Sequence, residues 1–486
     1  MRIAIIGAGP GGLCMGKRLL DEDFNDFVIL ERAEDVGGTW YVNRYPGSEC
    51  DTPAVLYSFT FEQYHKWSKK YPKQPEILDY LRHIADKFNL RPHCRFGYGV
   101  THAKWRTSTS TWLLTLDSGE KIEAEIVVSA VGSEPHYPDI DGIDTFKGVF
   151  LHSSQLDSDH DFSGEKVAII GSNAGAIQLV PQVVKRAPQV YLFQRTPVHV
   201  LPKHDEPESP RKYKAALADP KLYSQMRDNV EQEVNGNLSF SDPKKLIAFE
   251  NEALSAIAVV KDPKVREKLY PKFSFGLRLP SLSNTYYRAF NERNLELVDC
   301  PIVQITEHNI LTMDGTTRQI DMIIAATGFE TAKCMSSIDV KGTNGLSITR
   351  VRDKYTMSYL DMMTAGFPNL FMIVGRNINT GSIPTLIEAQ VDYIITHLLR
   401  MLNNNLIQVE VTEAAMQRYN SQIRAISGAK YFHRAVFSNN SNFQADTISP
   451  ITITEYQRLV RTINKGDFLV LPKTKSKQKT ERKKII

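Results

Sequence analysis

Short apolar runs recur along the chain and predict buried parallel strands. The first covers Ile3 to Ile6, and similar runs lie at 27–30, 126–130, 166–170, 191–193 and 321–325. Continuous apolar strands of this length are typical of parallel sheets that are covered on both faces. The first run leads directly into an apolar stretch that suits a helix, so the pattern predicts an α/β protein.

The pattern changes between Lys203 and about Arg266. This stretch is rich in charged residues, and its apolar positions from Leu246 to Val260 follow helical spacing. We interpret 205–266 as a helical insertion that forms part of a lid or of a substrate cavity. The sequence leaves open the alternative that the insertion only adds bulk.

Length and composition indicate a soluble protein with more than one domain. The 486 residues exceed what one ordinary core holds, and 42% are hydrophobic and 23% charged. The 59 basic and 55 acidic residues are too balanced to indicate a nucleic-acid partner. Every apolar run is shorter than about 18 residues, so we expect no membrane span.

The cysteines and the two ends of the chain indicate the compartment. The five cysteines are scattered and never form a Cys-x-x-Cys pair, which predicts reduced thiols, no zinc or other metal site and no dithiol centre; they are Cys14, Cys50, Cys94, Cys300 and Cys334. A buried strand that begins almost at Met1 leaves no room for a leader peptide, so we expect a cytoplasmic protein. The lysine-rich end, 471–486, is typical of a disordered tail.

A dinucleotide motif follows the first strand. The sequence there is Gly7-Ala8-Gly9-Pro10-Gly11-Gly12, which satisfies G-x-G-x-x-G. Glycines at 7, 9 and 12 suit a tight turn, close approach of backbone N–H groups to a pyrophosphate, and close packing of helix on strand. About 20 residues on, Glu31 ends the second strand, where a carboxylate can hold the ribose of an adenosine. An ordinary glycine-rich turn is the alternative.

A second glycine-rich stretch covers 37–47. It reads Gly-Gly-Thr-Trp-Tyr-Val-Asn-Arg-Tyr-Pro-Gly and is closed by Cys50-Asp51. Glycines let backbone approach a flat ring, aromatic side chains stack on it, and polar groups face it, which together suit a bound flavin. Core packing is the alternative role for Trp40 and Tyr41.

This stretch resembles the flavin-binding segment of class B flavoprotein monooxygenases, in particular the Baeyer-Villiger monooxygenases. The likeness continues through Tyr57-Ser58-Phe59, through 74–81 and through the Ala-Thr-Gly-Phe turn at 326–329, and it covers roughly 1–400. It implies two Rossmann-like domains: an FAD-binding domain from 1–150 and 326–470, and an NADPH-binding domain from 151–325.

The resemblance also implies which residues bind FAD. They are Gly7, Gly9, Pro10, Gly11, Gly12, Glu31, Arg32, Gly38, Thr39, Trp40, Asp51, Tyr57, Val100, Gly132, Thr327 and Gly328. Of these, Asp51 is expected close to the reactive face of the flavin, as a catalytic residue. The closing strand and helix around Thr380–Ser382 and Ile387–Gln390 resemble the family's, in which the helix N-terminus points at the flavin ring.

A second dinucleotide unit opens after the strand at 166–170. Its turn contains Gly171, Asn173 and Ala174 in the pattern G-x-N-x-x-A, and we expect Asn173 to serve because Asn tolerates a positive φ better than other residues with side chains. The next strand ends in Arg195-Thr196. An arginine here can grip a 2′-phosphate with two N–H groups, which favours NADPH over NADH. The expected NADPH contacts are Gly171, Asn173, Ala174, Gln178, Arg195, Thr196 and Arg278.

The segment around Gly276 departs from the family pattern. Where the resembling enzymes carry Lys-Arg, this chain has Arg278-Leu279, so the Lys keeps its charge and the catalytic Arg is lost. A fixed cation beside a flavin peroxide and the developing alkoxide stabilises both. We expect Arg278 or Arg376 to supply that cation, and Arg278 is our catalytic candidate, unless the chemistry shifts to sulfur or nitrogen oxidation.

A fingerprint around His152 matches in its first half only. Phe146-x-Gly148-x-x-x-His152 resembles a motif that Baeyer-Villiger enzymes share with flavin-containing monooxygenases, but Leu156 replaces the usual Trp. We expect His152 to support the hinge between domains without proton chemistry.

The implied function is an FAD- and NADPH-dependent monooxygenase that uses dioxygen through a C4a-peroxyflavin. Oxygen insertion next to a ketone is favoured, and oxidation of sulfur or nitrogen is the alternative because of Leu156 and Leu279. A disulfide-type reductase is a further class, but this chain has no cysteine pair for that chemistry. An inactive nucleotide-binding protein is a third possibility. The altered C-terminal region and basic tail suit a bulky or carrier-bound ketone, such as a polyketide intermediate. The oligomeric state stays open.

Overall fold

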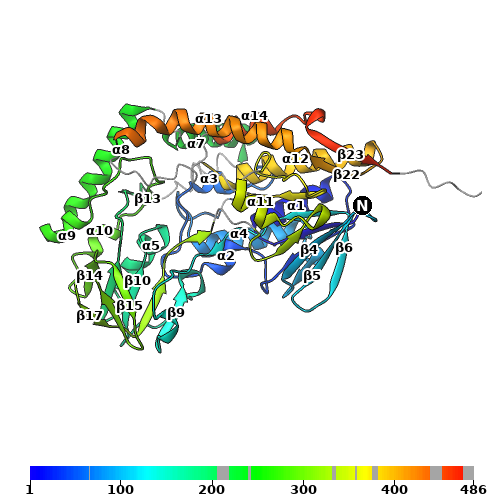
Figure 1. Ribbon diagram of the computed structural model, residues 1–486. Coiled ribbons are helices and arrows are strands. Elements are labelled where there is room, and N and C mark those ends of the chain that lie inside the picture. The colour runs from blue at the N-terminus through cyan, green and yellow to red at the C-terminus, as the bar shows by residue number, and fades with distance from the viewer. Residues whose placement is uncertain are drawn as a thin grey trace, which may run out of the picture.

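The computed structural model describes residues 1–64, 66–204, 218–238, 242–330, 335–355, 358–374, 381–437 and 451–473 (Figure 1). Two five-stranded sheets organise the chain, and every strand pair in both sheets is parallel. We call the first sheet with the elements packed on it the first unit, and the second sheet with its elements the second unit.

The first sheet has the order β21-β7-β1-β2-β3. These strands are β21 (Leu370–Met372), β7 (Ile126–Ser129), β1 (Ile3–Ile6), β2 (Phe27–Glu31) and β3 (Cys94–Phe96). Strand β1 is buried along its whole length because both of its faces are covered, each by different elements. Ile3 and Ile5 pack against helices, whereas Ala4 and Ile6 pack against a smaller four-stranded sheet that also belongs to the first unit.

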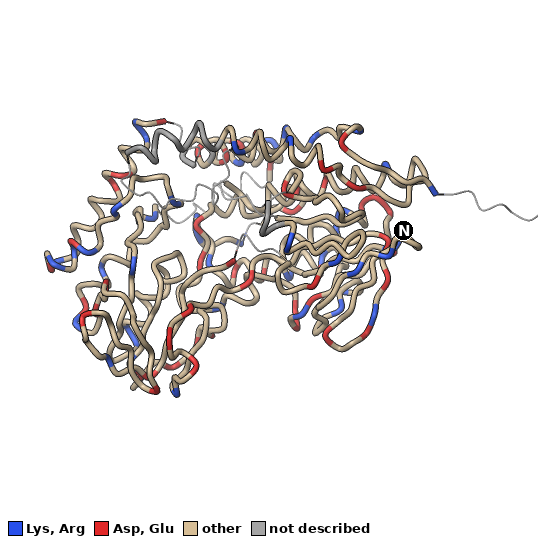
Figure 2. The backbone as a smooth tube through the Cα atoms, in the orientation of Figure 1, with Lys and Arg blue, Asp and Glu red and all other residues tan. Residues whose placement is uncertain are grey.

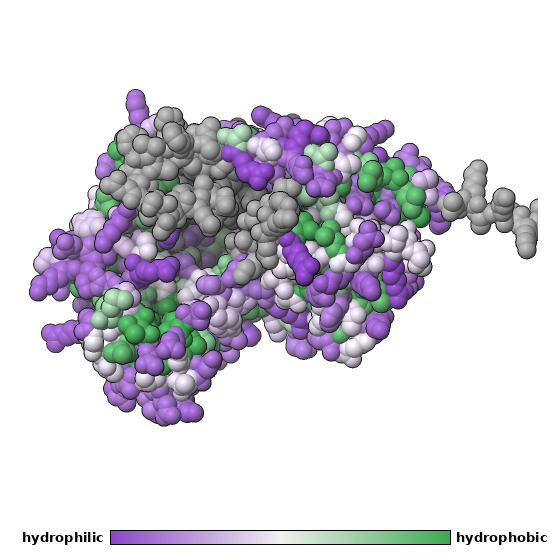
Figure 3. Space-filling model, viewed as in Figure 1, coloured by the Kyte–Doolittle hydropathy of each residue, from purple (hydrophilic) through white to green (hydrophobic). Residues whose placement is uncertain are grey.

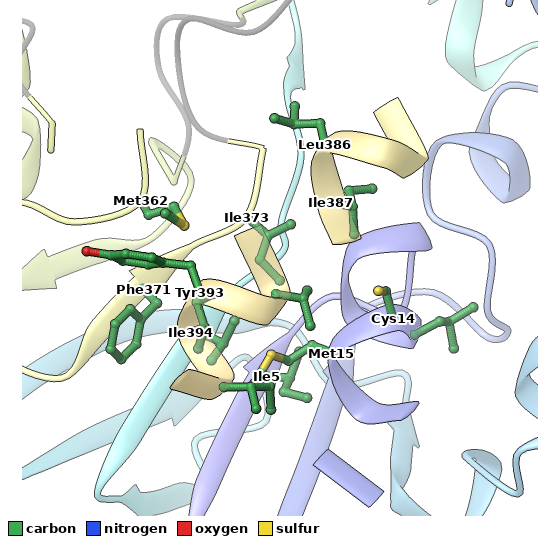
Figure 4. Close-up of a cluster of buried hydrophobic side chains, with 14 of the residues drawn as sticks. Ile5, Cys14, Met15, Met362, Phe371, Ile373, Leu386, Ile387, Tyr393 and Ile394 are labelled. Carbon is green, nitrogen blue, oxygen red and sulfur yellow. The ribbon is translucent and has the colours of Figure 1, made fainter. Parts of the chain in front are cut away.

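Three helices cover the helical face of the first sheet. They are α1 (Pro10–Asp21), α4 (Gln74–Lys87) and α12 (Ile383–Asn403). Figure 4 shows side chains of α1, α12 and β1 meeting in this core. The opposite face carries the sheet β20-β4-β5-β6, formed by β20 (Asp339–Lys341), β4 (Val100–Arg106), β5 (Thr111–Leu116) and β6 (Lys121–Ala124).

The second sheet repeats this design in the order β14-β11-β10-β18-β9. Its strands are β14 (Leu295–Val298), β11 (Gln189–Phe193), β10 (Lys166–Ile170), β18 (Met322–Ala325) and β9 (Val149–His152). One face packs on α5 (Ala174–Val183) and α10 (Tyr286–Ala289). The other face packs on an antiparallel sheet of β15 (Ile302–Ile305), β16 (Asn309–Thr312) and β17 (Thr317–Gln319).

The described part of the insertion is helical, as the periodicity predicts, while 205–217 and 239–241 lie outside the described residues. It contains α7 (Pro220–Leu238), α8 (Pro243–Ala256), η4 (Ile257–Val259) and α9 (Pro263–Lys268). Arg227 of α7 is buried against the first unit, where it donates hydrogen bonds to the carbonyls of Val55 and Ser58 at 2.9 and 2.8 Å. Ile257, just beyond α8, packs in the core of the second unit. The insertion therefore bridges the two units.

The C-terminal region returns to the first unit. It contains α13 (Glu413–Phe437) and α14 (Ile453–Val460), and β22 (Leu406–Val411) pairs antiparallel with β23 (Phe468–Pro472). Because Leu471 and Pro472 belong to β23, the start of the disordered tail predicted at 471 is wrong. Residues 474–486, the rest of that predicted tail, lie outside the described residues.

Shorter elements connect these layers. They are α2 (Thr39–Val42), α3 (Ala54–Tyr57), η1 (Arg91–His93), β8 (Glu134–Pro135), η2 (Ile143–Thr145), η3 (Ser153–Gln155), β12 (Val200–Leu201), β13 (Ser281–Leu282), β19 (Phe329–Glu330), η6 (Thr343–Gly345), α11 (Ile348–Tyr355) and η8 (Lys465–Asp467). Figure 2 shows basic and acidic residues interspersed along the chain, and Figure 3 shows hydrophilic side chains over much of the same face. Among the described helices, none is long and apolar enough to span a membrane.

Candidate active site

A cavity of about 280 Å³ lies at the carboxyl ends of β1, β2 and β7, and we call it the first cavity. Its lining includes seven of the predicted flavin contacts, namely Gly7, Gly9, Glu31, Arg32, Gly38, Thr39 and Val100. In open α/β sheets, ligands bind in the crevice outside the carboxyl ends of the strands. The first cavity occupies that place in the first unit.

The backbone around the first cavity has no room for side chains at two glycines. Gly7 has φ +105°, and a Cβ there would lie 2.6 Å from the carbonyl oxygen of Ala130. Gly38 has φ +53°, and its Cβ would lie 2.8 Å from the Cα of Gly9. The β1–α1 turn and the Gly37–Gly38 turn therefore meet backbone to backbone. Directly after the β1–α1 turn, Pro10, Gly11 and Gly12 form the first turn of helix α1.

Glu31 fixes the shape of this turn. Its buried carboxylate accepts hydrogen bonds from the backbone N–H of Ala8 at 2.6 Å and of Ala33 at 2.8 Å. A carboxylate has about four acceptor positions, so both oxygens can still accept from a ribose. The neighbouring Arg32 is exposed and lies 3.4 Å from Glu134.

Trp40 is buried in the core of the first unit, and the partly buried Tyr57 packs against that core. The indole N–H of Trp40 donates to the Tyr57 hydroxyl at 2.7 Å, and the rings meet edge to face at 5.5 Å. Neither residue lines the first cavity. Gly132 lies between Val131 and Ser133, which do line the first cavity.

The second unit repeats the glycine turn with one difference. Gly171 has φ +140°, and a Cβ there would lie 1.9 Å from the carbonyl oxygen of Ala326. The expectation that Asn173 uses a positive φ is wrong, because its φ is −85°. Its side-chain oxygen instead accepts from the N–H of Ala176 at 3.3 Å and caps α5, whose first residue is Ala174. Asn is among the best residues for an N-cap, which explains it at this point.

The other predicted NADPH contacts lie apart from one another. Arg195 and Thr196 follow the carboxyl end of β11, and Arg195 is exposed. Gln178 instead joins the two units, because it accepts from the Tyr45 hydroxyl at 2.9 Å and donates to the carbonyl of Glu49 at 3.0 Å. Thr327 and Gly328, which were predicted as FAD contacts, form the turn after β18, where the Thr327 hydroxyl donates to the carbonyl of His136.

A cavity of about 370 Å³ lies where the insertion meets both units, and we call it the second cavity. Its lining is Asp51, Thr52, Pro53, Lys70, Tyr71, Leu201, Pro202, His204, Val230, Glu233, Val234, Phe249, Glu252, Phe275, Leu279, Pro280, Leu282 and Gly381. Helices α7 and α8 contribute five of these residues, so the insertion lines a cavity, while its role in a lid or in substrate binding stays a prediction.

Arg278 does not meet Asp51. Its side chain is exposed, its guanidinium carbon lies 5.2 Å from the centre of the Phe273 ring, and it lines neither the first nor the second cavity. Leu279 faces the second cavity in its place. The other predicted replacement cation, Arg376, lies outside the described residues.

A different cation meets Asp51. The buried ammonium of Lys203 lies 3.3 Å from Oδ1 of Asp51 and 2.9 Å from Oε1 of Glu49. Burial raises the pKa of Asp51, and the positive charge of Lys203 opposes that rise. Sequence reasoning missed Lys203, because a lysine in a charged stretch usually lies in solvent and its partners are about 150 residues away.

The comparisons with known proteins agree with this architecture. A family model described as pyridine nucleotide-disulphide oxidoreductase matches residues 4–209. A Baeyer-Villiger monooxygenase of Streptomyces coelicolor is 34% identical over 97% of this chain and 93% of its own. The chain belongs to the Baeyer-Villiger monooxygenase family. Another member, cyclohexanone 1,2-monooxygenase of Acinetobacter sp., is 29% identical over 91% of each chain.

Solved structures of the family share the whole fold. A closed crystal structure of cyclohexanone monooxygenase superposes with a TM-score of 0.87 at 27% identity, covering 97% of this chain and 99% of that one. A cyclohexanone monooxygenase from Rhodococcus bound to NADP+ gives 0.86 at 28% identity and the same coverage. The resemblance read from the sequence and the predicted fold of two Rossmann-like units are thereby confirmed.

In this Baeyer-Villiger family member, His152 has a structural environment. Its Nε2–H donates to the carbonyl of Gly328 at 3.0 Å, which leaves Nδ1 to accept from the Ser154 hydroxyl at 2.8 Å. Burial lowers the pKa of His152, which favours the neutral ring. The ring joins the end of β9 to the turn after β18. Leu156, which replaces the family's Trp, is buried in the core of the second unit.

Proposed function

We propose that this family member is an FAD- and NADPH-dependent monooxygenase that inserts one oxygen atom next to the carbonyl of a ketone and gives an ester or lactone. One atom of dioxygen enters the product, and the other leaves as water with two electrons from NADPH and two protons. The single observation that carries this proposal is the glycine-walled first cavity at the carboxyl ends of β1, β2 and β7.

In this proposal the first cavity holds FAD. The contact between Gly9 and Gly38 suits the close approach of backbone N–H groups to a pyrophosphate, and Glu31 accepts from the ribose. When bound, the flavin takes electrons from NADPH and activates dioxygen at its C4a carbon. A structural relative with a TM-score of 0.86 is described as a complex with FAD and NADP. The domain assignment is FAD for 1–150 and 326–470, and NADPH for 151–325.

NADPH binds in this proposal at the turn that opens the second unit. Gly171 permits the close turn before α5 and Ala174 begins that helix, while Arg195 grips the 2′-phosphate and Thr196 donates from its hydroxyl. Because the amide of Gln178 is already bonded to Tyr45 and Glu49, its role is to hold the two units together at this site.

The second cavity is proposed to bind the ketone. Its volume of about 370 Å³ lies in the range of small-molecule sites, and Val230, Val234 and Phe249 of the insertion supply apolar wall. Asp51 and Leu279 face the same space. A bulky ketone, or one held on an acyl carrier, is the finer proposal. Comparing turnover of a free ketone with its carrier-bound thioester tests it.

Oxidation of sulfur or nitrogen is the second candidate. The observation that favours it is the pair Arg278 and Leu279, because the cation stacks on Phe273 while the apolar side chain faces the cavity. Without a cation at that point, an oxygen donor bound there keeps its proton more readily and transfers oxygen as an electrophile.

One set of measurements tests the proposal. The purified holoprotein should be yellow, and rapid mixing with NADPH and then dioxygen should give the spectrum of an oxygenated flavin before reoxidation. Products from matched panels of ketones and thioethers then separate ester formation from sulfoxidation. A colourless protein that takes up no FAD, or direct reoxidation with release of hydrogen peroxide only, would contradict the proposal.

A further inference from the structure

Lys203 has an environment that is unusual for a lysine. Its side chain is 4% exposed, although lysines are among the residues most rarely buried without a partner. The three ammonium N–H groups face three acceptors: Glu49 at 2.9 Å, the carbonyl of Cys50 at 3.1 Å and Asp51 at 3.3 Å. An ammonium has three donors and no acceptor, so this set satisfies it completely.

The backbone of Lys203 is held as firmly as its charge. Its N–H donates to the side-chain oxygen of Asn284 at 2.8 Å, and its carbonyl accepts from the Asn284 amide at 2.6 Å. The ammonium also lies 4.9 Å from the centre of the Tyr71 ring. Lys203 and Asn284 both belong to the second unit, whereas Glu49, Asp51 and Tyr71 belong to the first. The lysine therefore crosses from one unit to the other.

Of the two carboxylates that meet Lys203, Asp51 lines the second cavity, as does the nearby Tyr71. Its carboxylate is 29% exposed, and Oδ2 accepts from the N–H of Leu282 at 3.4 Å while Oδ1 meets Lys203. One ammonium faces two carboxyl groups, so the cluster carries a net negative charge when both are ionised. The titratable groups that face Asp51 or Lys203 are Tyr45, Glu49, Cys50 and Tyr71, and Lys70, His204, Glu233 and Glu252 share the second cavity.

We propose that Lys203 is the positioning residue that holds Asp51 as an oriented carboxylate at the wall of the second cavity. This inference rests on the proposed function. An ionised Asp51 can only accept a hydrogen bond from the reacting groups, whereas a protonated one donates. Lys203 thus determines whether Asp51 at the cavity wall accepts or donates a hydrogen bond.

The test uses the oxidised holoprotein and the variants Lys203→Met and Lys203→Arg. Infrared difference spectra recorded against pH follow the protonated carboxyl band of Asp51, which is identified by its loss in Asp51→Asn. We expect Lys203→Met to move the midpoint of this band upward by at least about one pH unit, and Lys203→Arg to keep it near the native midpoint. Lys268→Met is the matched control, because it breaks an exposed lysine–aspartate pair, 2.6 Å from Asp299, away from both cavities.

Turnover supplies the second measurement. In Lys203→Met, kcat should fall about tenfold for each unit by which the pKa of Asp51 exceeds the working pH, and raising the pH should restore it. KM for NADPH should change little. In the Asp51→Asn background, Lys203→Met should have no further effect on kcat. An unmoved band, or a pH-independent loss of kcat, would overturn the proposal.

Glu49→Gln keeps the proposal testable if Lys203→Met does not fold. Without the negative charge of Glu49, the positive charge of Lys203 lowers the pKa of Asp51 further, so the midpoint of the band should move to lower pH. A band that stays or rises would contradict the assignment. If the native enzyme oxygenates nothing, the proposed function fails, while the infrared titration still decides whether Lys203 controls Asp51.

Discussion

The hydroxyl of Tyr45 donates a 2.9 Å hydrogen bond to Oε1 of Gln178, and so connects the glycine-rich stretch of the first unit to helix α5 of the second. The same amide donates to the carbonyl of Glu49 at 3.0 Å. Together with the Lys203 cluster, this contact joins the two units beside the cavity that contains Asp51. The units therefore share polar contacts at the place where the proposed cofactors and substrate must meet.

We expect Tyr45→Phe to loosen this junction. The substitution removes one partly buried hydrogen bond, which lowers the free energy of unfolding by about 1 kcal/mol. FAD content should stay the same, and KM for NADPH should rise. Urea unfolding and steady-state kinetics measure both effects. The control is Tyr137→Phe, which removes a 3.0 Å bond from an exposed Tyr to Gln155 and should cost less than about 0.5 kcal/mol.

Gly171→Ala should remove NADPH binding and leave FAD binding intact. The new Cβ would lie 1.9 Å from the carbonyl oxygen of Ala326, so the turn that opens the second unit must shift. We expect a yellow protein whose flavin is reduced by dithionite but no longer by NADPH. Gly164→Ala is the control, because it also has a positive φ, +86°, but no atom within 4 Å of the new Cβ. Loss of FAD in Gly171→Ala would contradict the assignment of the two units.

Arg195→Ala should raise KM for NADPH about 10- to 100-fold and change KM for NADH much less. A hydrogen bond to a charged group contributes about 1.5–3 kcal/mol, and only NADPH carries the 2′-phosphate. Arg186→Ala, which changes an arginine bonded to the carbonyl of Ser158 near the other end of α5, is the control. Equal losses for both nucleotides would refute the role of Arg195.

Local patterns predicted the two units well, because their causes lie within a few residues. The apolar runs became strands, and the glycines of G-x-G-x-x-G stand where only a hydrogen fits, as at Gly12, whose Cβ would lie 1.9 Å from the carbonyl oxygen of Gly7. The same reasoning gave the wrong conformation for Asn173, since an N-cap and a left-handed turn favour the same residue type.

Long-range contacts could not be read from the sequence. Lys203 and Asp51 meet across 152 residues, and neither has a neighbour in sequence that marks the pair. Arg278 was the natural candidate because it keeps the charge of the family motif, but Leu279 takes the place at the cavity. Which of two adjacent side chains faces a cavity depends on packing by distant helices, and no periodicity records it.

The environment of His397 predicts that the folded protein loses stability at low pH. It lies on α12 and is fully buried, and neither ring nitrogen has a hydrogen-bond partner within the described part of the chain. The rings of Tyr393 and Phe468 lie 4.8 and 4.7 Å away. Burial lowers the pKa of His397 to about 3. The folded protein therefore keeps this ring neutral at a pH where the unfolded chain has already bound a proton.

The stability that His397 contributes is present above about pH 6.5, the ordinary pKa of an unfolded histidine, and is lost as the pH falls toward 3. At about pH 5 the loss from this group reaches about 2 kcal/mol. We expect His397→Phe, which fills the aromatic pocket without a titratable group, to lose about 2 kcal/mol less than the native protein between pH 7.5 and pH 5. Urea unfolding of the holoprotein at both pH values measures the difference, with the exposed His102→Gln as control.

His199, whose pKa burial lowers to about 4, acts in the same direction in the native protein and in both variants, so it cancels in the comparison. An equal acid loss in His397→Phe and in the native protein would show that His397 is protonated or solvated in the fold.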